Sequence, residues 1–176
     1  MEIDVKKISA DLGVKLGLLL FLSNAVFYII DLELFLNWKI SIIFFVIVIG
    51  SGIYSILNSR KKLGGYINWS DGFISYMACV AVGMLIAALT QIFIFVILDP
   101  GAAEQLNEMS MIMVKEMYTG MNLPEEVIQQ ALIELEKNPQ LSLSNLSLSL
   151  AVGLGIQAIF GAINALIFKR SNSEIA

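Results

Sequence analysis

Four long apolar runs, separated by polar segments, dominate the sequence. They cover about residues 12–30, 38–57, 73–98 and 146–168. Each run reaches the roughly 20 residues that a helix needs to cross the hydrocarbon core of a bilayer. Stretches such as "LLLFL" and "IIFFVIVIG" lack the polar position every three or four residues that a helix of a soluble bundle shows. The pattern therefore predicts an all-α chain that forms an integral membrane four-helix bundle.

Residues 99–145, between the third and fourth runs, follow another pattern. Asp99 as a cap and Pro100 in a first turn predict a helix that ends at Gly120, and a second helix is predicted from Pro124 to about Asn138. Each helix has one apolar face by i+3 and i+4 spacing. These faces comprise Leu106, Met109, Met113 and Met117, and Val127, Ile128, Ala131, Leu132 and Leu135. We expect an amphipathic helical hairpin whose apolar faces contact each other or the bilayer.

The starts of the third and fourth long helices are predicted from local sequence signals. In the gap "NSRKKLGGYINWSDGF" at 58–73, Gly64-Gly65 predicts a tight turn, and Ser70 or Asp71 is expected to cap the third helix. The stretch "LSLSNLSLSL" at 141–150 alternates with the period of a strand. Because an isolated strand in lipid would leave its backbone unpaired, we predict a loop that enters the fourth helix, with Ser144 or Asn145 as its cap.

Lysine and arginine are unevenly distributed between the two sides of such a bundle. One side carries seven cations, namely Lys6, Lys7, Arg60, Lys61, Lys62, Lys169 and Arg170. The other carries Lys39, Lys115 and Lys137, although it includes the long insert. An excess of cations marks the cytoplasmic face. Both termini are therefore predicted to be cytoplasmic and the hairpin extracytoplasmic.

One alternative for the N-terminus stays open. The apolar "LGLLLFL" followed by "SNA" at 23–25 is similar to a cleavable signal peptide. However, "VFYII" extends the run to a spanning length, and three acids lie in the region before its apolar centre. These features favour a retained span.

Composition excludes several kinds of site. The chain is 57% apolar with a net charge of −4, contains no histidine and has one cysteine, Cys79. No disulfide, imidazole ligand or cysteine-based metal site can be built, and the negative charge argues against a nucleic-acid partner. "MSMIM" at 109–113 raises copper(I) binding, but on a helix Met109 and Met111 point about 200° apart. We predict no catalytic residues, no cofactor and no metal.

Small and polar residues within the spans are the remaining candidates. Gly13 and Gly17, and Gly153 and Gly161, have the four-residue periodicity that lets helices approach closely, which also allows a homo-oligomer. Amides occur at Asn24, Gln91, Gln157 and Asn164. They are expected to form hydrogen bonds between helices, or alternatively a polar lining for a small neutral solute.

Several features together resemble a known family. They are the basic loop running into "GGYINWSDGF", "LDP" after the third run, the acidic helical insert and the closing "NALIFKR". With the spacing of the runs, they resemble the uncharacterised bacterial membrane family called domain of unknown function 4199. The resemblance implies the bacterial inner (plasma) membrane, and it implies no activity, substrate or catalytic residue.

Three function classes remain open. The first is a non-enzymatic interaction or assembly component, which uses the acidic hairpin to contact a membrane or periplasmic protein. The second is an oligomeric small-solute channel or transporter. The third, a membrane enzyme that uses carboxylates of the insert, lacks a recognisable catalytic constellation. The sequence favours the first.

Overall fold

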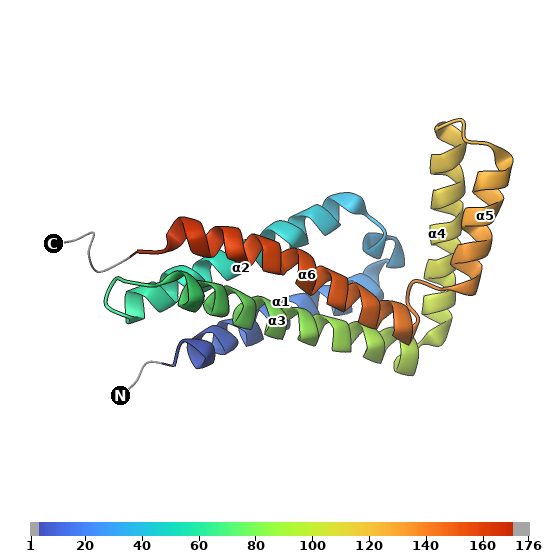
Figure 1. Cartoon of the computed structure of the whole chain (residues 1–176). Coiled ribbons are helices and arrows are strands. Elements are labelled where there is room, and N and C mark those ends of the chain that lie inside the picture. Colours follow the sequence, from blue (N-terminus) through green and yellow to red (C-terminus); the bar gives the residue numbers. More distant parts are fainter. Residues whose placement is uncertain (1–3, 171–176) are drawn as a thin grey trace.

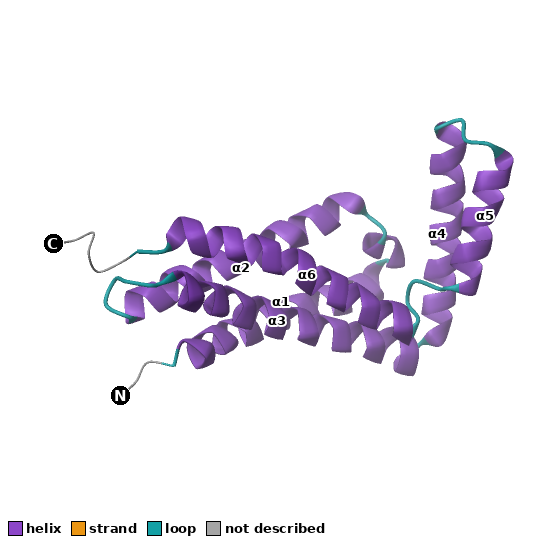
Figure 2. Cartoon of the chain, in the orientation of Figure 1, coloured by secondary structure: helices purple, strands orange, loops and turns teal. Residues whose placement is uncertain are grey.

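Helices make up nearly all of the computed structural model, which describes residues 4–170 (Figure 1). In chain order they are α1 (Val5–Ile30), the short 3₁₀ helix η1 (Leu32–Phe35), α2 (Trp38–Lys62), α3 (Trp69–Ile92), the π-helical turn η2 (Phe93–Leu98), α4 (Pro100–Gly120), α5 (Glu125–Lys137) and α6 (Leu143–Phe168). Within residues 4–170 the only β pairing is one bridge between Ile67 and Arg170, so Figure 2 is almost entirely helical.

Within the described residues, four helices are long and apolar enough to cross a membrane, namely α1, α2, α3 continued by η2, and α6. Their exposed side chains are largely apolar; Ile29 and Ile43, for example, are 78% and 57% exposed. Exposed apolar surface on this scale matches a hydrocarbon solvent rather than water. The predicted all-α fold, with four helices able to span a membrane and an inserted helical hairpin, is confirmed.

The chain runs back and forth, so the two ends of the bundle differ. Both ends of the described chain lie at one end of the bundle, here called the terminal end (Figure 1). The α4–α5 hairpin crosses the opposite end, here called the hairpin end, at a steep angle to the spanning helices. α3 lies centrally and packs against α1, α2 and α6.

The base of the hairpin is fixed to the bundle by apolar packing and by Asp99. Phe95 on η2 and Leu106 on α4 are 1% and 2% exposed and belong to one apolar cluster. The Asp99 carboxylate caps α4 by accepting from the Ala102 N–H at 3.0 Å, as predicted, and also accepts from the Tyr28 hydroxyl at 2.9 Å. The hairpin is therefore tied to α1 as well as to the end of α3.

The predicted start of α6 is wrong. The helix already begins at Leu143, and its cap is Ser142, whose hydroxyl accepts from the Asn145 N–H at 3.3 Å. The Asn145 amide instead donates to the carbonyls of Asn138 and Pro139, at 3.1 and 2.9 Å. Most of the alternating serine–leucine stretch is thus helical, because a helix pairs its backbone internally.

The predicted cap of α3 is also wrong. The helix begins at Trp69, and the Asn68 side chain accepts from the Asp71 N–H at 2.8 Å while donating to the Asp71 carboxylate at 2.8 Å. Asp71 therefore completes a reciprocal capping pair rather than acting as the cap itself.

Candidate functional site

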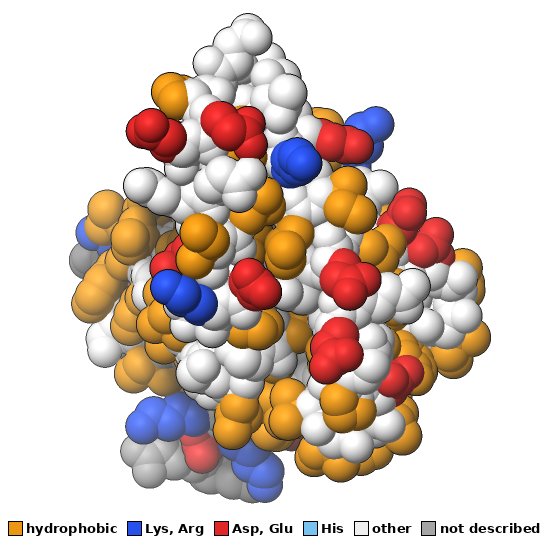
Figure 3. Space-filling view, turned by 90° about the vertical axis from the view of Figure 1, so that its right-hand side faces the viewer, with side chains coloured by type: hydrophobic (Ala, Val, Ile, Leu, Met, Phe, Trp, Pro, Cys, Tyr) orange, Lys and Arg blue, Asp and Glu red, His pale blue; other side chains and the backbone are white. Residues whose placement is uncertain are grey.

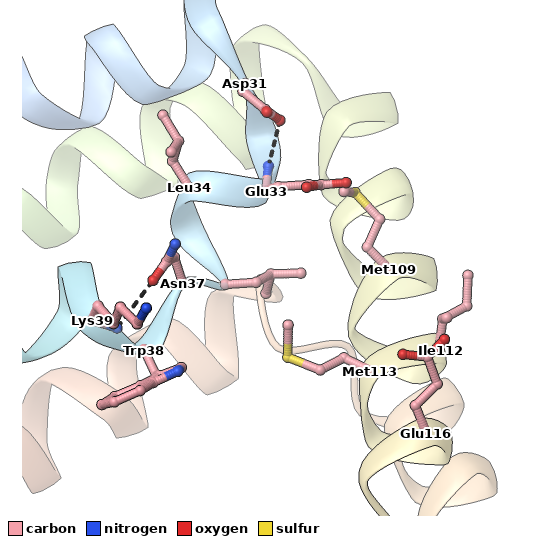
Figure 4. A pocket seen from close by; sticks show the side chains of 11 residues that line it. Asp31, Glu33, Leu34, Asn37, Trp38, Lys39, Met109, Ile112, Met113 and Glu116 are labelled. Carbon is pink, nitrogen blue, oxygen red and sulfur yellow. Dashed lines mark hydrogen bonds between the residues drawn. The ribbon is translucent and has the colours of Figure 1, made fainter.

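A groove of about 560 Å³ separates α4 from the segment 31–39 at the hairpin end (Figure 4). We call it the hairpin groove. Its lining residues are Asp31, Glu33, Leu34, Leu36, Asn37, Trp38, Lys39, Met109, Ile112, Met113 and Glu116. A volume of this size lies within the roughly 300–1,000 Å³ typical of ligand pockets.

One wall of the hairpin groove is shaped by two consecutive helix caps. The Asp31 carboxylate accepts from the Glu33 N–H at 2.9 Å and starts η1. The Asn37 side chain accepts from the Lys39 N–H at 3.1 Å and starts α2. Caps of this kind satisfy N–H groups that the first turn leaves free. They hold the backbone of segment 31–39 in one conformation.

The opposite wall is one face of α4. Met109 and Met113 are four residues apart, so their side chains project to the same side of α4. In Figure 4 the Met109 and Met113 side chains extend from α4 toward segment 31–39. Ile112 and Met113 are 59% and 48% exposed, so they remain accessible. Methionine is flexible and polarisable, and it adapts to different apolar partners.

The charges of the groove favour a cationic ligand. Asp31, Glu33 and Glu116 provide three carboxylates against the single ammonium of Lys39, so the lining carries a net charge of −2. The Lys39 ammonium lies 5.9 Å from the centre of the Trp38 ring, within the range of a cation–π contact. Trp38 is itself 66% exposed. The groove thus combines apolar contacts with excess negative charge.

The surface around the groove continues this character. Acidic and apolar side chains are interspersed over the hairpin end of the molecule (Figure 3). From 99 to 146 the sequence has eight acids against Lys115 and Lys137, a net charge of −6. The same surface therefore attracts cations at longer range.

The predicted orientation of the methionine face needs correction. Leu106 is buried against the bundle, Met109 and Met113 face segment 31–39, and Met117 is 48% exposed. At Leu106, Met109 and Met113 the face is thus directed toward the bundle and toward segment 31–39. The reason is the direction that Asp99 and the cluster around Phe95 impose on α4. On α5, Ile128 is the buried residue, at 3% exposed.

The four predicted amides within the spans fall into two groups. Asn24 and Gln91 line a second crevice of about 200 Å³ between α1, η1, α2 and α3. Gln157 accepts a hydrogen bond from the Tyr76 hydroxyl at 2.6 Å, and Asn164 donates to the Phe160 carbonyl at 2.8 Å. Asn24 and Gln91 thus share a cavity. Gln157 on α6 forms the expected hydrogen bond to another helix, whereas the hydrogen bond of Asn164 stays within α6, contrary to the expectation.

The four predicted small residues lie at contacts between helices. A Cβ at Gly13 would lie 2.6 Å from the Cys79 carbonyl oxygen, and one at Gly17 would meet Ile86. A Cβ at Gly153 would lie 2.8 Å from the Met84 methyl carbon, and one at Gly161 would lie 2.8 Å from the Tyr76 ring.

The sequence did not indicate a buried cluster of four serines. Ser75 on α3 lies with its hydroxyl oxygen 2.8 Å from that of Ser9, 3.0 Å from that of Ser55 and 2.9 Å from that of Ser59. All four side chains are 0% exposed. With oxygens this close, the hydroxyls bind one another and join α1, α2 and α3.

The five cations predicted to determine the topology, Arg60, Lys61, Lys62, Lys169 and Arg170, lie at the terminal end of the bundle. α2 extends to Lys62, so its three cations form the last helical turn rather than the connection that the sequence suggested. This position is favourable because the C-terminus of a helix carries partial negative charge.

Comparison with known proteins identifies one family. The family described as "Protein of unknown function (DUF4199)" matches residues 11–170. No curated protein and no solved structure matches the chain.

Proposed function

The chain belongs to the DUF4199 family of proteins of unknown function, and we propose that it is a non-enzymatic membrane component that binds a partner protein in the hairpin groove. The proposed ligand is an amphipathic, positively charged segment of a membrane or periplasmic protein. The observation that carries the proposal is the combination of an accessible apolar groove with a net charge of −2.

The chemistry of the groove supports this class of ligand. A helical segment places an apolar anchor every three or four residues, and an open groove lined by methionines suits such anchors. Basic side chains of the ligand would then pair with Glu33 and Glu116, which line opposite walls. The fixed base of the hairpin, held through Asp99 and Tyr28, keeps the two walls in place and reduces the entropy lost on binding.

The location forms part of the proposal. We place the chain in the bacterial inner membrane with both termini cytoplasmic, because seven cations lie on the terminal side of the spans and three on the hairpin side. The groove then opens on the extracytoplasmic surface, beside Trp38, where an exposed indole suits the headgroup region of the bilayer.

The crevice between Asn24 and Gln91 favours a second function, passage of a small solute through an oligomer. The core of a single bundle is filled by side chains such as Tyr76, Cys79 and Val80, each 0% exposed. A path for solute would therefore continue from this crevice between copies of the chain. Flux through proteoliposomes that Gln91→Leu abolishes would support this function over the first.

Site-specific photocrosslinking in the native membrane tests the main proposal. A photoreactive residue at Ile112 would lie in the groove, whereas one at Ile133, 46% exposed on α5, would lie outside it. We expect an adduct of one defined mass from position 112 and none from position 133. Equal crosslinking at both positions would contradict a groove-specific partner.

A second experiment tests whether the carboxylates of the groove are needed for binding. Glu33→Gln with Glu116→Gln brings the groove lining from −2 to 0 and should abolish the adduct at position 112. The matched control, Glu126→Gln with Glu136→Gln, removes two exposed carboxylates from α5 and should leave the adduct unchanged. An adduct that survives the groove variant would exclude a basic ligand.

A further inference from the structure

Two helix ends that are far apart in sequence meet at the terminal end of the bundle. The backbones of Ile67 and Arg170 pair through two hydrogen bonds, of 3.1 and 2.9 Å. The Arg60 guanidinium donates to the Phe168 carbonyl at 3.4 Å. These contacts bring the last turn of α2, with Arg60, Lys61 and Lys62, to the same corner as Lys169 and Arg170.

The loop after α2 holds this corner in shape. Gly64 and Gly65 have φ of 81° and 101°, a left-handed conformation that residues with a Cβ rarely adopt. Their N–H groups donate back to the carbonyls of Lys61 and Arg60, at 3.3 and 2.9 Å. The loop therefore folds onto the end of α2, while the Lys61 and Lys62 side chains remain exposed.

An aromatic pair beside this corner indicates where the corner would lie relative to the bilayer. Trp69 stacks on Phe73 with ring centres 5.5 Å apart, and its indole N–H donates to the Ala162 carbonyl of α6 at 3.2 Å. Trp69 is 45% exposed. An indole with one apolar face and a bound N–H is typical of the interface between headgroups and acyl chains.

Two acids at the terminal end take part in capping helices. The Asp4 carboxylate accepts from the N–H groups of Lys6 and Lys7, at 3.0 and 3.2 Å. The Asp71 carboxylate accepts from the Asn68 amide at 2.8 Å. Neither carboxylate forms an ion pair with the cations of the corner among residues 4–170. Lys61, Lys62, Lys169 and Arg170 are exposed, so their side chains are accessible to a ligand.

We propose that the corner formed by Arg60, Lys61, Lys62, Lys169 and Arg170 binds the headgroups of anionic phospholipids. The three cations of α2 alone are fewer than the four to eight that such sites contain, whereas the five that the fold assembles fall within that range. Arginine suits this ligand because its fork of N–H donors matches two phosphate oxygens. This lipid surface is independent of the hairpin groove and of its proposed partner.

The two tryptophans of the chain provide the test, because they lie at opposite ends of the bundle. Trp38→Phe leaves Trp69 as the only reporter at the basic corner, and Trp69→Phe leaves Trp38 at the hairpin end. Each purified protein is placed in bilayers that contain brominated phosphatidylglycerol or brominated phosphatidylcholine. Quenching of tryptophan fluorescence then measures which lipid lies next to the reporter.

We expect quenching at Trp69 to favour phosphatidylglycerol severalfold and quenching at Trp38 to show no such preference. Each cation near an anionic surface contributes about fivefold to affinity. Lys169→Gln with Arg170→Gln should therefore remove most of the preference at Trp69. The control pair Lys115→Gln with Lys137→Gln, on the hairpin, should leave it unchanged. Unchanged circular dichroism verifies folding of each variant.

Two outcomes overturn the inference. The first is equal quenching by the two lipids at Trp69 in the protein with Arg60–Lys62 and Lys169–Arg170 intact. The second is loss of the preference on adding inorganic phosphate but not on adding chloride at the same ionic strength, which would indicate a site for free phosphate instead of a lipid.

Discussion

Tyr76, on α3, fills the contact between α2 and α6. Its side chain is 0% exposed and lies between Gly52 on α2 and Gly161 on α6, while its hydroxyl binds Gln157. A glycine at both flanking positions provides space for the ring, because a Cβ on either side would overlap it. The spacing of Gly153 and Gly161 in the sequence indicated a close helix contact. It did not indicate that an aromatic ring fills it, since Tyr76 is far away in sequence.

Gly161→Ala should therefore destabilise the protein. The new Cβ would lie 2.8 Å from the Tyr76 ring, which can shift little between two helices. Overpacking of this kind costs about 1–3 kcal/mol. Gly155→Ala is the matched control on the same helix, because nothing lies within 4 Å of its added Cβ. Thermal unfolding in detergent should show a lower midpoint for the first variant only. The reverse order of the two midpoints would contradict the orientation of α6.

The serine cluster is also a feature of the residue scale, and no local pattern of residues indicates it. Ser9, Ser55, Ser59 and Ser75 are 16 to 66 residues from their partners. Taken singly, each serine is indistinguishable in the sequence from any small residue of an apolar helix. Their convergence depends on the register of three helices, which a hydrophobic pattern does not specify.

Ser75→Ala should destabilise the bundle more than a serine change elsewhere in the spans. Removing its hydroxyl leaves three buried hydroxyls without their shared partner, and interhelical hydrogen bonds contribute about 0.6–2 kcal/mol each. We expect a loss of about 1–2 kcal/mol. Ser147→Ala, an exposed position on α6 that bonds only to its own helix, serves as control. Equal unfolding midpoints for the two variants would show that the cluster contributes nothing.

At the scale of elements, a helix end was predicted correctly where the residues that determine it lie within a few positions of one another. α4 begins and ends where the sequence predicted, with Asp99 as cap, Pro100 in the first turn and Gly120 as the last residue. These signals were reliable because cap, proline and terminal glycine each act within a few residues. The start of α6 was missed because alternating serine and leucine suits a strand, a loop or a helix. The role of Asn145 there depends on the carbonyls of the preceding loop, six and seven residues away.

The link between the hairpin and α1 yields a prediction for α4 alone. Tyr28→Phe removes the hydrogen bond to the Asp99 carboxylate, which should cost about 1–2 kcal/mol. Hydrogen exchange should accelerate in the first turns of α4, while exchange within α2 and α6 stays unchanged. Tyr54→Phe is the control, because Tyr54 is 59% exposed on α2. Unchanged exchange in α4 would mean that apolar packing alone fixes the hairpin.

At the scale of the whole molecule, the number of spans, the hairpin and the family followed from the sequence. The hairpin groove did not, because it depends on the direction in which α4 leaves η2. That direction is determined by contacts of Phe95, Leu106 and Tyr28 across three elements. The groove therefore exists only in the assembled fold, and its proposed role requires that the hairpin lie outside the cytoplasm.

Labelling of introduced cysteines in intact cells tests this requirement most directly. In a Cys79→Ala background, Gly120→Cys places a thiol at the exposed tip of the hairpin, and Lys61→Cys places one at the terminal end. A maleimide that cannot cross the membrane should label position 120 in intact cells and position 61 only after the cells are permeabilised. Labelling of position 61 but not 120 in intact cells would reverse the topology and contradict an extracytoplasmic partner in the groove.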